Sequence, residues 1–209
     1  MSESRATYVT RKTTETEINC ALNLDGDVVY WVTTGMPFFD HMLQLFSKHS
    51  SFDLELTGRG DLAVDGHHTA EDAGLCLGQA IKKALGEKAG INRFGDAIIP
   101  MDEALVMTAV DLSGRGHLVF DVPMPAARIG DFDTELVEEF LRSLAINGEF
   151  NLHVRLLSGK NTHHIIEAVF KALARSLKSA VVRVGGAWWR MGGPSRPAES
   201  DAPRAQPWR

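Results

Sequence analysis

The sequence predicts an α+β fold made by internal duplication, with two copies of a strand–helix–strand–helix unit. Strand-like and helix-like segments recur in the same order in the two halves of the 209-residue chain. In addition, the pattern His-His-x-x-Glu occurs once in each half, at His67–Glu71 and His163–Glu167, and each copy opens an apolar helical run. We therefore expect a first repeat over residues 1–95, a second over residues 96–186 and an irregular C-terminal tail over residues 187–209.

The first repeat opens with segments typical of β structure. Ala6–Leu24 is rich in Thr and Val and has alternating apolar positions, which predicts extended structure. The turn Asp25–Asp27 predicts a hairpin in which Val28–Thr33 pairs back. The remaining predictions are a helix over Phe38–His49, a strand over Phe52–Thr57, a turn over Gly58–Gly60, a strand over Leu62–Val64 and a helix over Thr69–Leu85. The core residues expected on these helices are Phe39, Met42, Leu43, Phe46, Ala73, Leu77, Ala80, Ile81 and Ala84.

The second repeat shows the same succession of patterns. Its predicted elements are a hairpin of Ile98–Met101 with Leu105–Leu112, a strand over His117–Val122, a helix over Asp133–Asn147, a strand over Phe150–Leu157 and a helix over His163–Val184. The first of these helices should turn Leu136, Phe140, Leu141 and Leu144 toward the core.

The composition is that of an ordinary soluble globular protein, with 44% hydrophobic and 23% charged residues. The net charge of −5 argues against unspecific attraction to a nucleic-acid backbone. The two cysteines, Cys20 and Cys76, have no paired spacing, which indicates a reducing compartment. Met1–Lys12 lacks the apolar core of a signal peptide, and no apolar run is long enough to predict a membrane span. We expect a cytoplasmic protein without nucleic-acid or membrane partners.

Helical geometry separates the two histidines of each motif. Residues four apart on a helix share a face, whereas the next residue is turned by about 100°. His67 and Glu71 can therefore hold one metal ion while His68 points elsewhere, and in the second motif His164 is the corresponding spare histidine. This predicts two metal ions shared between two motifs. Mixed imidazole and carboxylate ligands suit manganese, iron or zinc, and several carboxylate-containing ligands per ion favour octahedral manganese.

Two other interpretations of the motifs are weaker. The zinc-protease signature is His-Glu-x-x-His, and the order of residues here differs from it. Alternatively, each helix simply begins with solvated polar residues that include histidine. That interpretation is adequate for one copy, but two copies in a chain with only 8 histidines argue against it.

A further pair of candidate ligands comes from the helix that precedes each motif. Aligning Phe38–Leu43 with Leu136–Leu141 brings His41 and Glu139 to equivalent places in the two repeats. Both side chains can bind a metal ion. For Glu139, the alternative is a solvated helix carboxylate beside Glu138.

Five motifs carry a specific resemblance to a known family. They are Gly35–Leu43 (GMPFFDHML), Asp65–Asp72 (DGHHTAED), Gly90–Asp96 (GINRFGD), Asp111–Gly116 (DLSGRG) and Gly159–Lys171 (GKNTHHIIEAVFK). Together they resemble imidazoleglycerol-phosphate dehydratase, a hydro-lyase family of histidine biosynthesis, over roughly residues 7 to 184. The resemblance implies a duplicated α/β sandwich of the ribosomal protein S5 domain 2-like type. It also implies a homo-24-mer with active sites between subunits and two Mn²⁺ per active site.

The resemblance also implies the ligand set of each metal ion. One ion would be held by His41, His68, His163 and Glu167, and the other by His67, Glu71 and His164. Family members often supply one more histidine to the second ion, from a stretch that resembles Val137–Leu141. Glu139 stands at that position here. We predict that Glu139 replaces the histidine as a ligand.

The same resemblance implies residues that contact a small phosphate-bearing substrate. Arg93, Arg115 and Lys171 resemble the phosphate contacts of the family, and guanidinium groups bind phosphate through paired hydrogen bonds. Glu15 matches a substrate-facing glutamate.

The resemblance weakens at the C-terminus. Members usually end with a Pro-Ser-x-Lys-Gly loop that closes on the phosphate, whereas this chain has Pro194-Ser195-Arg196-Pro197. Ser195 and Arg196 are therefore candidate phosphate contacts, with Arg196 in place of the lysine charge.

The implied reaction converts D-erythro-imidazole-glycerol phosphate into imidazole-acetol phosphate by loss of water. The C–H bond to be broken is not activated by a carbonyl group. Two Mn²⁺ on the nitrogens of the substrate ring would lower its pKa, so that an imidazolate forms and expels the neighbouring hydroxyl. A carboxylate can then remove the next proton, and Glu15 and Glu71 are the candidates.

Two other functions remain open from the residues alone. A dinuclear metal-dependent hydrolase would use the same metals to activate water. A non-catalytic metal-binding or storage shell would also need the metal ligands, but it has no use for Arg93, Arg115 and Lys171 as a phosphate pocket.

Overall fold

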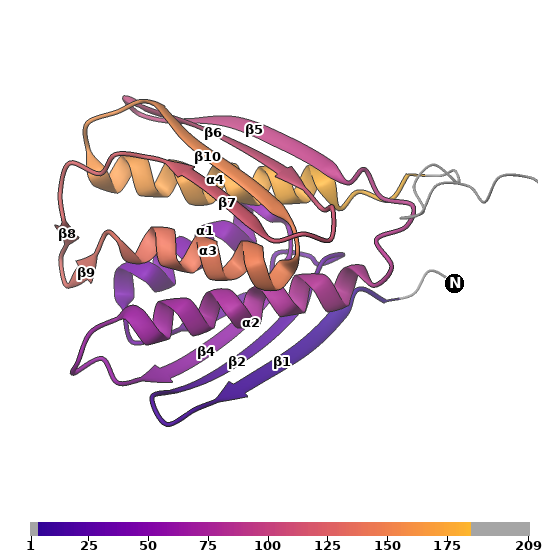
Figure 1. Cartoon of the computed structure of the whole chain (residues 1–209), viewed down its shortest axis with the longest axis horizontal. Helices are drawn as coiled ribbons and strands as arrows, with labels where there is room; N and C mark the ends of the chain where they lie inside the picture. The colour runs from indigo at the N-terminus through magenta and orange to yellow at the C-terminus, as the bar shows by residue number, and fades with distance from the viewer. Residues whose placement is uncertain (1–3, 185–209) are drawn as a thin grey trace, which may run out of the picture.

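The computed structural model describes residues 4–184 and consists of two four-stranded sheets with helices between them (Figure 1). The first half contains β1 (Ala6–Lys12), β2 (Thr16–Asn23), β3 (Tyr30–Thr33), α1 (Pro37–Ser50), β4 (Asp53–Gly60) and α2 (His67–Leu85). The second half contains β5 (Phe94–Met101), β6 (Ala104–Asp111), β7 (His117–Asp121), β8 (Arg128–Ile129), β9 (Phe132–Asp133), α3 (Leu136–Gly148), β10 (Asn151–Ser158) and α4 (Thr162–Ala180).

The two sheets have equivalent strand orders, β1-β2-β4-β3 and β5-β6-β10-β7. In each sheet the first three strands pair antiparallel, and the last strand pairs parallel to its neighbour. The helices occupy equivalent positions as well, α1 with α3 and α2 with α4. This arrangement confirms the predicted α+β duplicated sandwich. Strand β5 begins at Phe94 and therefore runs across the predicted boundary between residues 95 and 96.

The predicted hairpin through Asp25–Asp27 is wrong. β3 does not pair back on β2 but lies parallel to β4, because both edges of β2 are already paired, with β1 and with β4. The carboxylate of Asp53, at the start of β4, accepts hydrogen bonds from the backbone N–H groups of Asp27 (2.9 Å) and Val29 (2.8 Å). These bonds hold the loop across the start of β4. Strand β3 can then pair with the edge of β4 that β2 does not occupy.

The other differences concern where elements begin and end. Gly58–Gly60 is not a turn, because it continues β4 in register with Thr16–Ile18 of β2. Leu62–Val64 is not a strand, and the Val64 N–H closes a turn on the carbonyl of Asp61 at 2.7 Å. Helix α3 begins at Leu136 instead of Asp133, because Phe132–Asp133 forms the small β8–β9 hairpin that the sequence did not predict.

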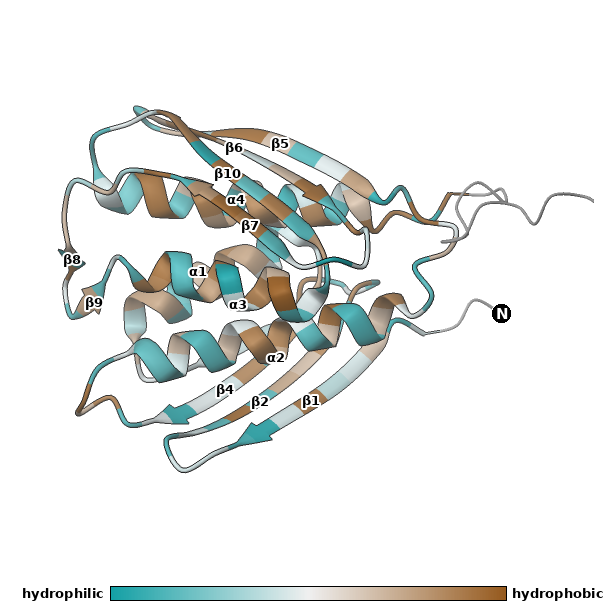
Figure 2. Cartoon of the chain, in the orientation of Figure 1, coloured by the Kyte–Doolittle hydropathy of each residue, from teal (hydrophilic) through white to brown (hydrophobic). Residues whose placement is uncertain are grey.

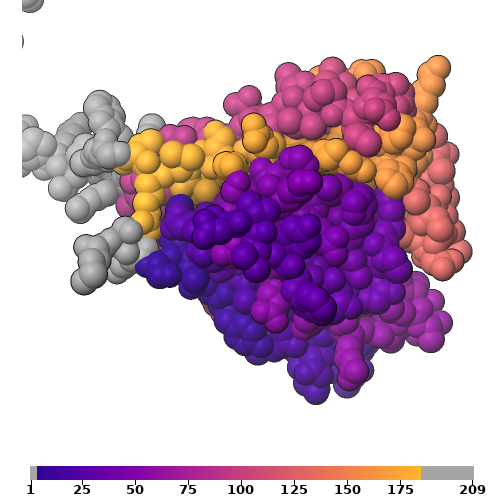
Figure 3. Space-filling model, turned by 180° about the vertical axis from the view of Figure 1, so that it is seen from behind, coloured from indigo at the N-terminus to yellow at the C-terminus, as the bar shows by residue number. Residues whose placement is uncertain are grey.

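The core lies between the sheets. Every second residue of β2 and β6 is buried, which is the period expected when one face of a strand packs on helices. Figure 2 shows hydrophobic residues on the strands and on the helices that lie between the sheets. At the centre, the ring of Phe140 lies 5.2 Å from that of Phe39 and 5.6 Å from that of Phe170, which joins α3 to α1 and α4. The space-filling view shows the two halves in direct contact (Figure 3). No helix within residues 4–184 is long and apolar enough to cross a membrane.

Helices α2 and α3 approach closely because glycines lie at their contact. A Cβ atom on Gly74 would stand 2.5 Å from the carbonyl oxygen of Phe140, and one on Gly78 would stand 2.6 Å from that of Leu144. Real Cβ atoms do not approach backbone oxygens this closely. The absence of side chains at these two positions therefore sets the distance between α2 and α3.

Replacing Gly74 with alanine should lower the thermal midpoint of unfolding. On a free helix this substitution stabilises by up to about 1 kcal/mol, whereas overpacking a core costs about 1–3 kcal/mol. The clash with backbone makes the second effect larger. Scanning calorimetry of Gly74→Ala beside Lys83→Ala, an exposed position on the same helix, would measure this. A higher midpoint for Gly74→Ala would contradict the close packing.

Candidate metal and substrate site

Both His-His motifs begin a helix, and both helices begin at the same end of the molecule (Figure 1). Each start is fixed by a polar side chain just upstream. The carboxylate of Asp65 accepts the backbone N–H of His67 at 2.8 Å. The side-chain oxygen of Asn161 accepts those of His163 (2.9 Å) and His164 (3.4 Å). These bonds satisfy N–H groups that a helix start leaves unpaired.

In the second motif, the predicted pair of ligands lies on one face of α4. The Nε2 atom of His163 is 3.4 Å from the Oε2 atom of Glu167. Glu167 is buried, and its other oxygen accepts a hydrogen bond from Lys171 Nζ at 2.6 Å. Burial by itself would raise the pKa of Glu167, but the hydrogen bond and charge of Lys171 outweigh it and the pKa is lowered. His41 of α1 also contributes to this lowering, so it lies near the same carboxylate.

The spare histidines point away from these pairs. The rings of His67 and His68 lie 6.1 Å apart at 89°, and those of His163 and His164 lie 6.2 Å apart at 78°. His68 Nδ1 lies 3.0 Å from Asp61 Oδ2, and His164 Nδ1 lies 2.7 Å from Glu103 Oε2.

These two contacts shift the pKa values of His68, His164 and Glu103. Donating a hydrogen bond to Asp61 raises the pKa of His68, and donating one to Glu103 raises the pKa of His164. The hydrogen bond from His164, followed by that from the backbone N–H of Asn161, lowers the pKa of Glu103 to about 2.

Glu15 lies in the turn between β1 and β2, at the same end of the molecule as the histidines. Hydrogen bonds from the hydroxyls of Thr14 and Thr13 lower its pKa, and the charge of His68 contributes in the same direction. The turn is held against α2 by Asp72, which accepts hydrogen bonds from Arg11 Nε at 2.7 Å and from the hydroxyl of Thr16. Asp72 follows Glu71 directly, so it connects the turn to the first motif.

Glu139 lies in the first turn of α3 and is half-buried. Its neighbour Glu138 forms an ion pair with Arg142, one helical turn along. α3 packs on α2 as α1 packs on α4. Since His41 lies near Glu167 across the α1–α4 contact, the repeat symmetry brings Glu139 to the corresponding side of α2, which carries Glu71.

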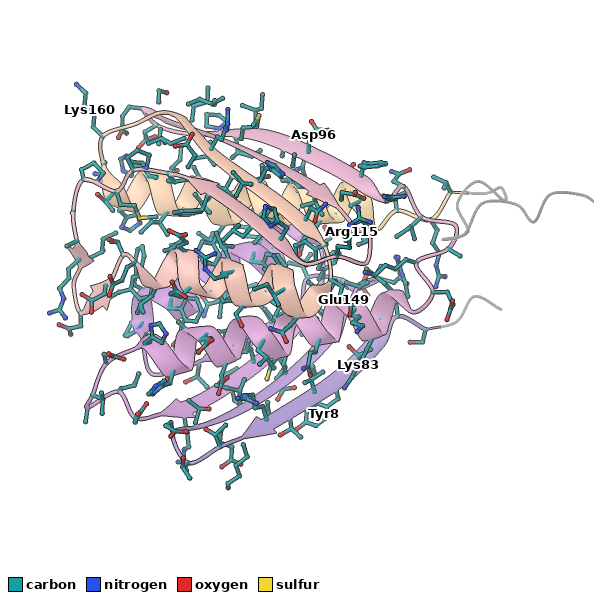
Figure 4. The ribbon with its side chains drawn as sticks, in the orientation of Figure 1. Tyr8, Lys83, Asp96, Arg115, Glu149 and Lys160 are labelled. Carbon is teal, nitrogen blue, oxygen red and sulfur yellow. The ribbon has the colours of Figure 1, made fainter. Side chains whose placement is uncertain are left out.

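The predicted phosphate-binding arginines lie at the other end of the molecule. The N–H of Arg93 donates to the carbonyl of Ala180, the last residue of α4, at 3.0 Å. Because a helix rises about 1.5 Å per residue, this is about 25 Å along α4 from His163. Arg115 lies close to this end, whereas Lys160, two residues before the first residue of α4, lies at the opposite one (Figure 4).

The side chain of Arg93 is oriented by a carboxylate. Asp111 accepts from Arg93 Nε at 2.7 Å and from Nη2 at 3.2 Å, and this hydrogen bonding raises the pKa of Arg93. The guanidinium carbon also lies 5.0 Å from the centre of the Phe94 ring.

The predicted site residues therefore form separate groups in one chain. Within residues 4–184, no three His, Cys, Asp or Glu side chains lie close enough together to hold a metal ion. The chain does offer pairs of the right chemistry, imidazole with carboxylate, which fit half of a metal shell. A pocket of about 610 Å³ within the described residues is lined by His163 alone among the predicted site residues. Ser195 and Arg196 lie outside the described residues.

Three carboxylates of these groups were not predicted from the sequence: Asp61, Glu103 and Asp111 as a partner of Arg93. No sequence pattern singles out Asp61 or Glu103 as a histidine partner, because each lies in a turn. Each meets its histidine only through the packing of a strand end against a helix start.

Comparisons with known proteins identify the family of the chain. The model of the family described as "Imidazoleglycerol-phosphate dehydratase" matches residues 34–177. The chain is 76% identical to the imidazoleglycerol-phosphate dehydratase of Pelotomaculum thermopropionicum over 186 residues, which cover 89% of this chain and 95% of the relative. It is 65% identical to that of Desulforudis audaxviator, over 84% of this chain and 90% of the relative.

Solved structures give the same result. The crystal structure of imidazoleglycerol-phosphate dehydratase from Staphylococcus aureus superposes with a TM-score of 0.78 at 38% identity, covering 86% of this chain and 99% of that one. The enzyme from Pyrococcus furiosus superposes with a TM-score of 0.75 at 36% identity, covering 87% and 97%. The chain belongs to the imidazoleglycerol-phosphate dehydratase family of hydro-lyases.

Proposed function

We propose that this chain dehydrates D-erythro-imidazole-glycerol phosphate to imidazole-acetol phosphate in cytoplasmic histidine biosynthesis, at sites built between chains around two Mn²⁺. Family membership carries the overall activity. The observation that supports the remainder is the division of the predicted site residues between two ends of one chain, with metal-binding pairs at one end and arginines at the other.

The donor pairs on α2 and α4 would hold the metals. His163 and Glu167 would bind one ion together with His41 and the spare His68, and His67 with Glu71 would bind the other together with His164 and Glu139. The spare histidine of each repeat is directed at a carboxylate outside its own helix, Asp61 for His68 and Glu103 for His164, which is consistent with sharing between sites. Within the described residues of one chain no three donors lie together, and we infer that neighbouring chains would complete the ligand set. A homo-oligomer, with the 24 subunits implied by the resemblance, would meet this need.

The arginines of a neighbouring chain would bind the substrate phosphate. Asp111 orients the guanidinium of Arg93 by accepting hydrogen bonds from Nε and Nη2, and guanidinium N–H donors match phosphate oxygens. Arg115 lies near the same end and would add a second guanidinium. Lys171, a predicted phosphate contact, donates a hydrogen bond to Glu167 of the metal-binding pair. It would therefore lie between the substrate phosphate and that pair.

Bound Mn²⁺ would supply Lewis-acid polarisation of the substrate imidazole, which lowers the pKa of its N–H groups. The chain itself must then move a proton at an adjacent carbon. Glu15 is the carboxylate best suited to this role, because it is exposed, ionised at neutral pH and held next to the first motif by the Asp72 network. Glu71 is less free to act if its oxygens are bound to metal.

Turnover of imidazoleglycerol phosphate should require the metal. We expect the purified protein to form the ketone product with Mn²⁺, to lose activity with a chelator and to regain it when Mn²⁺ is returned. Hydrolysis of phosphate esters without dehydration would indicate the dinuclear hydrolase instead. Metal binding without any turnover would indicate a storage shell.

Replacing Glu15 with glutamine should lower kcat by about 10²–10⁴-fold, the usual contribution of a general acid–base group. Assembly and Mn²⁺ content should stay unchanged, because Glu15 is not among the proposed ligands. Glu17→Gln is the matched control, since Glu17 lies on the same hairpin but pairs with Lys12. Wild-type turnover by Glu15→Gln would remove Glu15 from the mechanism.

Replacing Glu139 with alanine should weaken the ion held by His67 and Glu71, because it removes one anionic donor. Glu138→Ala removes the same charge from the adjacent position and should keep both ions. Elemental analysis after dialysis against graded chelator would compare the two variants. Retention of both ions with unchanged affinity in Glu139→Ala would show that Glu139 is not a ligand.

A further inference from the structure

The spare histidines, His68 and His164, each have a carboxylate at ring atom Nδ1. Among the described residues no such contact is seen for His67 or His163. His68 directs Nδ1 at Asp61, at 3.0 and 3.2 Å from its two oxygens, and His164 directs Nδ1 at Glu103, at 2.7 Å. By contrast, the contact described for His163 is made by Nε2, toward Glu167 on its own helix. In each repeat, therefore, the histidine with a carboxylate at Nδ1 is the one that would bind the metal ion of the other repeat.

The two carboxylates come from different places in the repeat. Asp61 follows β4, whereas Glu103 lies in the turn between β5 and β6. The turn equivalent to the latter in the first repeat, between β1 and β2, carries Glu15 instead. Since the same contact is reached from two non-equivalent loops, it is not simply inherited from the duplication. The recurrence points to a requirement at the histidine.

The carboxylate of Glu103 is itself held in place. It accepts the backbone N–H groups of Asn161 at 2.7 Å and Lys160 at 3.2 Å, just before α4 begins. Its second oxygen is then directed at His164. On the other side of the ring, His164 Nε2 lies 3.6 Å from Asp102 Oδ2, which is too long for a hydrogen bond. Nε2 is thus open to a ligand.

We propose that Asp61 and Glu103 are positioning residues that hold the Nδ1–H tautomer of His68 and His164 and so present each Nε2 lone pair to a metal ion. A carboxylate accepts only from a protonated ring nitrogen, so Nδ1 carries the hydrogen and the neutral imidazole leaves Nε2 as the donor atom. The same bond fixes the orientation of the ring. This inference rests on the proposed metal-binding function.

The test counts tightly bound Mn²⁺ per chain, using the electron paramagnetic resonance signal of free Mn²⁺ during titration of the assembled protein. Glu103→Gln keeps one oxygen for the backbone N–H groups and places an NH₂ donor against His164 Nδ1, which favours the wrong tautomer. Asp61→Asn does the same at His68. Glu87→Gln, which removes an exposed charge beyond the other end of α2, is the control.

Each single variant should weaken one ion by about 10–100-fold, the usual effect of removing an outer partner of a ligating histidine. The count of tight ions should fall from two to one in either variant and to zero in the double variant, with the thermal midpoint close to that of the control. Two tight ions in both single variants would overturn the inference, and so would a loss of both ions from one single variant with a lowered midpoint. Absence of tight Mn²⁺ from the unaltered protein would instead reject the proposed metal function.

Discussion

The packing of aromatic rings where α1, α3 and α4 meet determines how the helices are aligned, and the positions of the candidate site residues depend on this alignment. Phe39, Phe140 and Phe170 are fully buried and contact one another at 5.2–6.5 Å between ring centres. Burial of large aromatic side chains contributes more to stability than any other single contact in a core of this kind. Together with the glycine-lined approach of α2 to α3, it aligns the four helices between the sheets. The starts of α2 and α4 thereby come to one end of the molecule.

The chemistry follows from this alignment and from helical periodicity. Adjacent histidines at a helix start point in different directions, so one helix cannot bring both to one ion. Carboxylates from neighbouring turns then hold the histidine that points outward, while Lys171 keeps Glu167 ionised despite its burial. Arg93 lies about 25 Å away along α4, too far to reach the same ligand in the same chain, and Arg115 lies toward the same end of the molecule as Arg93. The proposed function therefore calls for neighbouring chains to complete the two partial sites of one chain.

The agreement between sequence and structure was good for helices and hairpins with local signals. The stripe Phe39, Met42, Leu43 and Phe46 is buried as predicted, and the β5–β6 hairpin turns at Asp102–Glu103. The error that changes the topology lies where pairing is not local. β3 pairs with β4 because β2 has no free edge, and no property of the segment from Val28 to Thr33 could have revealed this.

The sequence by itself determined the duplication and the family, because periodicity and motif order are written along the chain. The tertiary structure decided which side chains meet. Asp61 and Glu103 lie in turns, and a turn residue reaches a helix start only after the sheet and the helix have packed together. The separation of Arg93 from His163 likewise depends on the length of α4 and on the contact of Arg93 with its final residue. Contacts between distant segments depend on packing geometry, which local sequence patterns do not encode.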